Sequence, residues 1–420
     1  MKTLPGLRDG RLADPAILRA GPLAEALAAM NGGGEETRLV GGAVRDLALG
    51  LPVQDFDLAT TAAPDETIRR GRLAGFKTVP TGIAHGTVTL VVRGRPFETT
   101  TLRADVETDG RRAKVAFGRD FDADAERRDF TINALSLNAE GVAHDPVGGL
   151  ADLAAGRVRF IGDADRRIRE DYLRILRFFR FSARFADGPL DAPGVGAAIR
   201  NRDGMERLSR ERVRAELLKL LVAPRAAGVV RAMGEAGFLE PVLAGMAYPG
   251  RFARVVAIEA ARGAEPDPVL RLMGLAVATA EDGERLRDRL RLANAEFGRI
   301  EAAAPLLAAL HGRPPPENRA LRVLMFRAGR EAARDALTLA HAEAEAPPDD
   351  LAFADADAFL RAAPVPRSPF GGRDVMARGV PAGPRVSAAL RAFEALWVEA
   401  DFPGARQVLD GMLDAAIKGA

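Results

Sequence analysis

Residues 38–59 read RLVGGAVRDLALGLPVQDFDLA and indicate the type of fold. The first three residues predict a short strand, the two glycines a tight turn, residues 43–50 a short helix, and the polar and apolar alternation over 55–59 a second strand. Successive side chains of a strand point to opposite faces, so Asp55 and Asp57 are predicted to share one face. The stretch therefore predicts a small α/β unit that presents two carboxylates together.

The sequence on either side of this stretch extends the unit. Residues 1–35 predict a short helical lead-in. Two runs rich in Val and Thr, 87–92 and 96–102, predict strands joined by a turn at 93–95. A cluster of turn-forming residues at 145–149 is predicted to end this α/β domain.

From about Ala151 onward the strand signals stop, and Ala, Leu, Arg and Glu recur at helical spacing. Breaks that contain proline, at 223–225, 314–316 and 346–348, divide this part into helical units. We therefore predict an α+β protein with a small mixed-sheet domain followed by helical domains. The predicted boundaries are 1–150 for the mixed-sheet domain and 151–225, 226–345 and 346–420 for three helical ones.

The composition is that of a folded protein with several domains. The 420 residues are 47% hydrophobic and 28% charged, and a chain of this length is expected to form more than one core. No apolar run approaches the ~20 residues of a membrane span, and the N-terminal residues lack the apolar segment of a secretory signal. We therefore expect a cytoplasmic protein with no membrane association. Cysteine is absent and the four histidines lie far apart, so any metal is expected on oxygen ligands.

Arginine is unevenly distributed along the chain. The formal net charge is only +2, yet nine arginines and four acidic residues lie between Arg157 and Arg184. A GC-rich genome explains the general use of arginine, but not this clustering. A phosphate-rich partner would explain it.

The two aspartates gain meaning from the glycine turn before them. Two carboxylates that converge repel each other, and Mg²⁺ is the kind of hard cation that stabilises such a pair. An isolated Asp-x-Asp also occurs in surface turns, but here it follows Gly41 and Gly42 at a predicted helix start. Backbone N–H groups can bind a triphosphate at such a turn, and Arg45 can add positive charge. Glu98, on a predicted strand, is the candidate third carboxylate for a two-metal site; a solvent-facing strand glutamate is the alternative.

Two later segments add candidate binding residues. Residues 127–134 read RRDFTINA and place a basic pair and an acid before an apolar run, where they can reach a ribose and phosphates; a capped surface helix is the alternative. Residues 170–180 read EDYLRILRFFR and predict one helix on which Asp171 and Arg174 are neighbours across a turn. An ordinary ion pair between them is the simplest interpretation.

The alternative is that Asp171 and Arg174 select a nucleobase. Cytosine and adenine both present an amino donor beside a ring-nitrogen acceptor, whereas uracil and guanine present a carbonyl and an N–H. A carboxylate that accepts and a guanidinium that donates therefore match C and A and oppose U and G. Arg177 and Arg180 are rotated away from that edge of the helix and suit phosphates better.

These segments together resemble the family of class II tRNA nucleotidyltransferases and bacterial poly(A) polymerases, and most closely its bacterial CCA-adding members. The resemblance lies in the glycine turn, the aspartate pair, the 127–134 segment and the 170–174 segment, and spans about residues 38–220. It implies a catalytic head over 1–150, a nucleotide-selecting neck over 151–225, a body over 226–345 and a tRNA-binding tail over 346–420. Residues 103–119 have the length of a flexible loop kept by CCA-adding members, although Ala113 stands where we expect proline.

The resemblance predicts addition of CCA to the 3′ end of tRNA from CTP and ATP, without a template and by two-metal nucleotidyl transfer. The alternatives are a poly(A) polymerase that adds AMP to RNA 3′ ends, and A-only addition to tRNA. Mg²⁺ is the predicted cofactor, tRNA the predicted partner, and no protein partner is predicted. The candidate catalytic residues are Asp55, Asp57 and Glu98, of which Asp55 and Asp57 are the metal ligands. The candidate nucleotide-binding residues are Gly41, Gly42, Arg45, Asp46, Arg128, Asp129, Asn133, Asp171, Arg174, Arg177 and Arg180.

Overall fold

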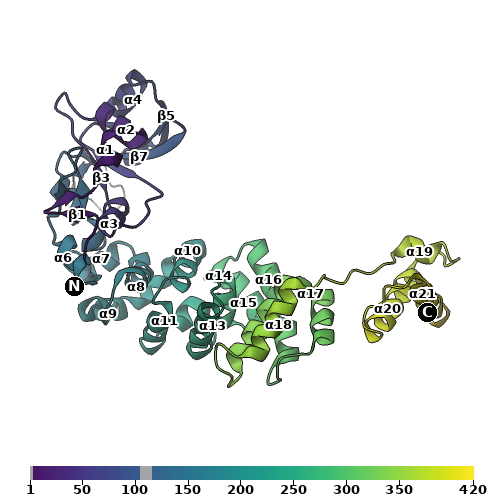
Figure 1. Cartoon of the computed structure of the whole chain (residues 1–420). Coiled ribbons are helices and arrows are strands. Elements are labelled where there is room, and N and C mark those ends of the chain that lie inside the picture. The colour runs from purple at the N-terminus through teal and green to yellow at the C-terminus, as the bar shows by residue number, and fades with distance from the viewer. Residues whose placement is uncertain (1–2, 105–115) are drawn as a thin grey trace. The chain divides into compact units, whose positions relative to one another are not determined.

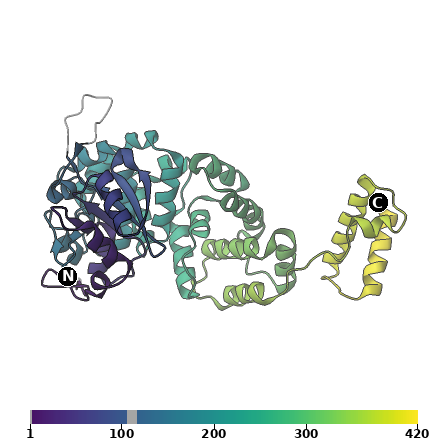
Figure 2. The ribbon, with the colours of Figure 1, turned by 90° about the horizontal axis from the view of Figure 1, so that it is seen from above.

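The computed structural model of the chain describes residues 3–104 and 116–420, and it divides into two compact units, Met1–Val229 and Val230–Ala420. Figure 1 and Figure 2 show the strands of the main sheet gathered in the first unit and helices alone in the second. Most of residues 103–119, the stretch that resembles a flexible loop, lies outside the described residues.

The first unit is built on a seven-stranded mixed sheet in the order β11-β10-β3-β4-β7-β6-β5. Only β4 and β7 pair in parallel, and the other neighbours are antiparallel. The strands are β3 (Thr37–Val40), β4 (Asp57–Thr60), β5 (Lys77–Gly82), β6 (Thr87–Val92), β7 (Arg95–Thr101), β10 (Ser136–Leu137) and β11 (Ala143–His144).

Short helices cover the sheet and connect its strands. The helices α2 (Pro22–Met30) and α4 (Pro64–Leu73) pack against each other and against β6 and β7. The helix α3 (Gly42–Ala48) follows β3 directly and packs on it and on the 3-10 turn η2 (Thr131–Asn133). Smaller elements are β1 (Leu7–Arg8), β2 (Arg11–Leu12), α1 (Ala16–Arg19), η1 (Ile83–His85), β8 (Arg103–Ala104), β9 (Ala116–Phe117) and α5 (Phe121–Glu126).

The rest of the first unit is helical and centres on α8 (Leu173–Phe185), which packs along α10 (Arg210–Leu221). One face of α8 is apolar, with Phe178 and Phe179 fully buried, and the other carries arginines. An amphipathic helix of this kind buries its apolar stripe and leaves the charged face for solvent or ligand. The helix α7 (Ala164–Glu170) also packs against α8, and against α9 (Ala192–Arg200). The other helical elements of this region are α6 (Gly149–Ala154), η3 (Arg202–Arg207) and α11 (Ala226–Glu235), and α11 runs across the division between the two units.

The second unit holds a series of helices. A linker over residues 363–371 divides this series. The helices before the linker are α12 (Leu239–Leu243), α13 (Pro249–Ala261), α14 (Pro268–Ala276), α15 (Ala280–Leu290), α16 (Asn294–Leu310), α17 (Asn318–Glu343) and α18 (Leu351–Ala362). Those after it are α19 (Gly372–Met376), α20 (Pro384–Glu399) and α21 (Arg406–Gly419). The last three share a core of their own around Phe393, Trp397 and Leu413, against which Phe326 of α17 also packs.

The predicted α+β class is confirmed, and within the described residues the last strand ends at His144. The three predicted proline-containing breaks fall between α10 and α11, between α16 and α17, and between α17 and α18. The strand predicted over 55–59 was placed wrongly, because β4 begins at Asp57. Its partner β3 ends at Val40, opposite Asp57, where Gly41 takes a φ of 70° and turns the chain away. Residues before Asp57 therefore have no β3 partner.

Within the described residues, no helix is both long and apolar enough to cross a membrane. The cytoplasmic location and the division into four domains stay predictions.

Candidate nucleotidyltransferase site

A polar cavity of about 600 Å³ lies in the first unit where α3, the start of β4, η2, α8 and α10 meet. Seven arginines and four aspartates are among its described wall residues, which leaves an excess of three positive charges. A concave site with such an excess suits a polyanion such as a triphosphate. The wall residues are Gly41, Gly42, Arg45, Asp46, Asp57, Arg128, Asp129, Asn133, Asp171, Leu173, Arg174, Arg177, Arg180, Phe181, Arg184, Phe185 and Arg212.

The glycine turn forms one wall of the cavity. Gly41 has a φ of 70° and a ψ of −128°, a conformation that side chains rarely tolerate, and its N–H donates to the carbonyl of Leu135. A Cβ on Gly41 would lie 2.6 Å from Nη1 of Arg128. Glycine is therefore required both by the backbone conformation and by the close approach of the Arg128 guanidinium.

Arg45 follows this turn on α3, and its guanidinium group is held by contacts with three residues. Its Nε donates to Asp46 at 2.9 Å and its Nη1 to Oδ1 of Asn133 at 2.6 Å, and its guanidinium lies 4.0 Å from the ring centre of Phe185. Only 6% of the residue is exposed. Burial lowers the pKa of Arg45, and the neighbouring Asp46 opposes that shift. Arg45 therefore joins α3 to η2 and α8 while bringing positive charge to the cavity.

The acidic side chains meet at the start of β4. Asp57 is paired in register with Glu98 of the parallel strand β7, so the two side chains are neighbours on the sheet. The Asp57 side chain is exposed at the cavity, but protein atoms lie around it on the other sides. Its pKa is raised, first by partial burial and then by the negative charges of Glu98 and Asp55. Arg128 opposes this shift. Asp55 and Glu98 do not form part of the cavity wall.

This crowding of carboxylates fits a divalent cation. Oxygen ligands are what hard cations prefer, and repulsion among the acids is the strain that a cation removes. Within the described residues, no three side chains of Asp, Glu, His or Cys are grouped closely enough to hold one ion. Hard cations such as Mg²⁺ are commonly bound through one or two carboxylates together with phosphate oxygens of the substrate, so two aspartates suffice.

A chain of hydrogen bonds connects η2 to α8. The Oδ1 atom of Asp129 accepts from the backbone N–H of Phe130 and from Nδ2 of Asn133, and its Oδ2 accepts from Nε of Arg177 at 2.7 Å. Arg128 donates to the carbonyl of Asn133 at 3.3 Å. Asp129 and Asn133 therefore orient arginines rather than point freely into the cavity.

The two predicted base-reading residues do not pair with each other. Arg174 donates from Nη1 to Glu170 at 2.6 Å and to the carbonyl of Arg167 at 2.9 Å. Asp171 accepts from the backbone N–H of Leu173 at 3.1 Å and from Nη2 of Arg212 at 2.7 Å. The simple ion pair between Asp171 and Arg174 is thus not what the structure contains, and both side chains lie in the cavity wall with separate partners.

Further along α8, Arg177 and Arg180 surround an aromatic ring. Their guanidinium carbons lie 5.2 Å and 4.3 Å from the ring centre of Phe181. Arg180 also forms an ion pair with the buried Glu216 of α10 at 2.6 Å, and burial lowers the pKa of Arg180. The packing against Phe181 and Glu216 fixes both arginines at the cavity wall.

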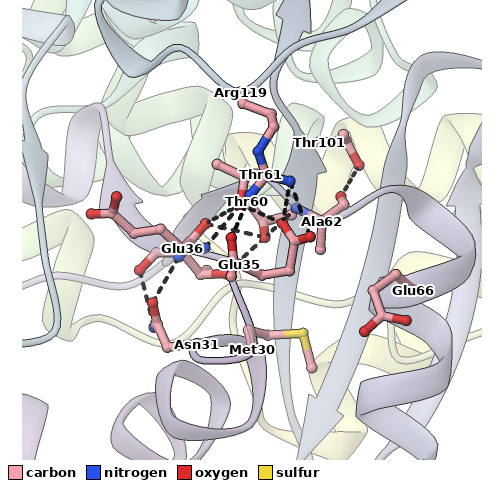
Figure 3. Close-up of polar contacts among 12 residues, drawn as sticks. Met30, Asn31, Glu35, Glu36, Thr60, Thr61, Ala62, Glu66, Thr101 and Arg119 are labelled. Carbon is pink, nitrogen blue, oxygen red and sulfur yellow. Dashed lines mark hydrogen bonds and ion pairs between the residues drawn. The ribbon is translucent and has the colours of Figure 1, made fainter.

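The far end of β4 is fixed by a separate polar network, shown in Figure 3. Thr61, just after β4, donates to Glu35 at 2.5 Å and accepts from the backbone N–H of Glu36 at 2.9 Å. Arg119 donates to both carboxylate oxygens of Glu35, at 3.0 Å and 2.9 Å. The hydrogen bond from Thr61, followed by Arg119, lowers the pKa of Glu35 against the opposing effect of burial. These hydrogen bonds fix the C-terminal end of β4. The pairing of β4 with its neighbouring strands then sets the position of Asp57 at the N-terminal end.

The structure brings together all the predicted nucleotide-binding residues and Asp57 in the cavity wall, whereas Asp55 and Glu98 are not among the wall residues. Sequence reasoning missed Leu173, Phe181, Arg184 and Phe185 in the cavity. Arg184 continues the three- and four-residue spacing of the α8 arginines, and this periodicity could have identified it. Arg212 belongs to the segment 209–212, which resembles the last motif of the family's neck, but it was assigned no role because its contact with Asp171 crosses 41 residues of sequence.

Comparison with known proteins agrees with this geometry. Residues 37–159 match the family described as "Poly A polymerase head domain", and residues 195–248 match "Probable RNA and SrmB- binding site of polymerase A". The first match covers all seven strands of the main sheet and the wall residues from Gly41 to Asn133. The resemblance of the motifs to the tRNA nucleotidyltransferases and poly(A) polymerases is therefore confirmed for the matched residues, which make up less than half of the chain.

Similar proteins include "CCA tRNA nucleotidyltransferase 1, mitochondrial" of Danio rerio, 41% identical over 62% of this chain and 61% of that protein. The "CCA-adding enzyme" of Geobacillus thermodenitrificans is 40% identical over 54% of this chain and 55% of that protein. The alignments therefore span less than two thirds of either relative. The crystal structure of the Bacillus stearothermophilus CCA-adding enzyme in complex with CTP is 28% identical, covers 94% of this chain and 98% of that chain, and has a TM-score of 0.72.

Proposed function

We propose that this protein adds CCA to the 3′ end of tRNA, using CTP and ATP and no nucleic-acid template. The observation that carries the proposal is the single cavity in which the glycine turn, Asp57, the η2 residues and the arginines of α8 meet. The similarity of the whole chain to a CCA-adding enzyme with CTP supports the same activity.

In the proposed reaction the 3′-hydroxyl of the RNA attacks the α-phosphorus of the nucleoside triphosphate, and pyrophosphate leaves. Asp55 and Asp57 would hold Mg²⁺, with Glu98 as the third carboxylate beside them. A cation bound there stabilises the charge that develops on the reacting phosphate.

The remaining wall residues bind and select the nucleotide in this proposal. The glycine turn approaches the triphosphate with its backbone N–H groups, and Arg128, Arg177 and Arg180 neutralise its charge. Asp171 accepts from the amino group of cytosine or adenine, and Arg174 donates to the ring nitrogen beside it.

The test is incorporation of each of the four labelled nucleoside triphosphates into tRNAs that lack one, two or three 3′ nucleotides. The proposal expects CMP on the two shorter substrates, AMP on the tRNA that ends in CC, and no further growth. AMP added only after CC, without CMP addition, would identify A-only addition. Repeated AMP addition to unrelated RNA ends would identify a poly(A) polymerase, and no incorporation at all would contradict the enzymatic role.

A further inference from the structure

The Asp171 carboxylate is held from two sides. One oxygen accepts from the backbone N–H of Leu173, two residues ahead on its own chain, at 3.1 Å. The other accepts from Nη2 of Arg212 at 2.7 Å. Arg212 comes from a different helix, α10, and lines the same cavity. Asp171 is therefore tied to the first turn of α8 and to α10 at once.

The stability of α10 does not explain why an arginine stands at position 212. This residue is in the first turn of α10, where Ser209 caps the helix by accepting from the backbone N–H of Arg212 at 3.4 Å. The N-terminal end of a helix carries partial positive charge, so a cation there is unfavourable. The Arg212 side chain is also 50% exposed and that of Asp171 35%, and ion pairs of this exposure add little to folding.

A fixed carboxylate is what discrimination between bases requires. An ionised carboxylate has about four acceptor positions, so the two contacts leave positions for an amino group of the base. When uracil or guanine is bound, a carbonyl faces the carboxylate, and the penalty is large only if the carboxylate cannot turn away. Removing Arg212 frees one oxygen of Asp171 and allows that rotation.

We propose that Arg212 is a positioning residue for nucleotide choice, which fixes the Asp171 carboxylate as the acceptor for the amino group of cytosine or adenine. This inference rests on the proposed function, since it assigns Arg212 to the same site. Arg212 acts through Asp171 and does not itself contact the reacting phosphates.

The experiment compares wild type with Arg212→Ala, Arg212→Lys and a control, Arg210→Ala, which removes a charge from the same helix outside the cavity wall. The readout is the ratio of kcat/KM for CTP to that for UTP on tRNA lacking its last three nucleotides. Arg212→Ala is expected to lower this ratio roughly tenfold, because the acceptor is no longer held against the mismatched base. Arg212→Lys is expected to recover part of it, and Arg210→Ala to keep the wild-type ratio.

Two further measurements separate positioning from a structural role. The melting temperature of Arg212→Ala is expected to equal or exceed that of wild type, because the removed cation is unfavourable at the helix start. In an Asp171→Ala background, Arg212→Ala is expected to have no further effect on the ratio, since a residue that acts through another loses its effect when that other is gone.

The outcomes distinguish this inference from the function on which it rests. A wild-type enzyme that prefers CTP, together with an unchanged preference in Arg212→Ala, overturns the role of Arg212 alone. An Arg212 effect that persists in the Asp171→Ala background also overturns it, because Arg212 would then act on the nucleotide directly. A wild-type enzyme that uses all four nucleotides equally overturns the proposed function together with this role.

Discussion

At the scale of single residues, the cavity wall contains two kinds of charged group. Some arginines are fixed by packing, whereas the ionised form of the Asp57 carboxylate is disfavoured by its surroundings. Arg45 is buried and Arg180 half-buried among aromatic and acidic neighbours, so their guanidinium groups are already placed before any ligand arrives. Asp57 is different, because its carboxylate is surrounded by protein and repelled by Glu98. We expect a site prepared in this way to bind a polyanion without much rearrangement, and the proposed cation would offset the repulsion at Asp57.

The first prediction concerns Asp57→Asn. Loss of a metal ligand removes several kcal/mol of transition-state stabilisation, so kcat is expected to fall on the order of 10³-fold. The melting temperature is not expected to fall, because the native state disfavours the charge that is removed. Incorporation of labelled CTP and thermal unfolding measure the two effects, with the exposed Asp65→Asn as a control for loss of a carboxylate. Turnover near the wild-type rate in a folded Asp57→Asn protein would remove Asp57 from the catalytic residues.

The second prediction concerns Gly41→Ala. The positive φ and the approach of Arg128 to 2.6 Å are both unfavourable for a Cβ, so we expect a loss of about 1–3 kcal/mol in the free energy of unfolding. KM for CTP should rise as well, because Arg128 is displaced. Gly75→Ala is the matched control, since Gly75 has a φ of 78° but nothing within 4 Å. If both variants change KM equally, the effect comes from stability and not from the turn.

At the scale of secondary-structure elements, α4 is tied to the end of α2 through Arg70, which a glutamate of α4 holds in place. Glu66 accepts from Arg69 at 2.6 Å and 2.7 Å and from Arg70 at 2.7 Å. Arg70 also donates to the carbonyls of Met30 and Asn31, the last residues of the α2 region labelled in Figure 3. These contacts keep the pair of helices in place over the sheet that carries Asp57.

The third prediction is a pH dependence of stability that comes from Glu66. Hydrogen bonds from Arg69 and then Arg70 lower the pKa of Glu66 from 4.5 to about 2. A carboxylate with a lowered pKa stabilises the fold above its unfolded pKa and loses that contribution as the pH falls toward its folded value. Glu66→Gln is therefore expected to be less stable than wild type at pH 7, by no more than about 1 kcal/mol, because the side chains of Glu66 and Arg69 are 28% and 59% exposed and solvent screens their interaction.

Urea unfolding of wild type and Glu66→Gln between pH 7 and pH 3 measures this difference. The gap between the two proteins is expected to stay constant down to about pH 4.5 and to narrow below it. A gap that widens on acidification would contradict the assignment.

The limits of sequence reasoning also lie at this scale. The glycine turn, the hairpin strands and the arginine face of α8 were predicted because they follow local periods and turn chemistry, and the motifs contain most of the residues that line the cavity. The long-range partners were not predictable. Arg45 and Asn133 are 88 positions apart, and Asp57 meets Glu98 only because β4 and β7 pair in parallel in that register. The start of β4 was misplaced because it depends on where its partner β3 ends.

At the scale of the whole molecule, the fourth prediction concerns tRNA. The arginine-rich helices of the first unit and the helical second unit are expected to bind tRNA largely through phosphates. The dissociation constant is therefore expected to rise steeply with salt, roughly 10³-fold between 50 mM and 200 mM if about six phosphates are neutralised. Filter binding across this range measures the slope. Affinity that does not respond to salt would contradict phosphate binding, as would full affinity in a folded chain that lacks residues 226–420.

The single tryptophan gives the molecule a built-in spectroscopic probe. Trp397 is the only indole in the sequence, and it lies in the core of α20 and α21, with its Nε1 donating to the carbonyl of Pro403 and its ring edge-on to Phe402. Fluorescence excited at the red edge of indole absorption therefore reports on the core of α20 and α21 and on its contact with Phe326 of α17, whereas circular dichroism averages over every helix. Two denaturation curves recorded on one unlabelled sample would then reveal whether the C-terminal helices melt together with the remainder of the chain or ahead of it.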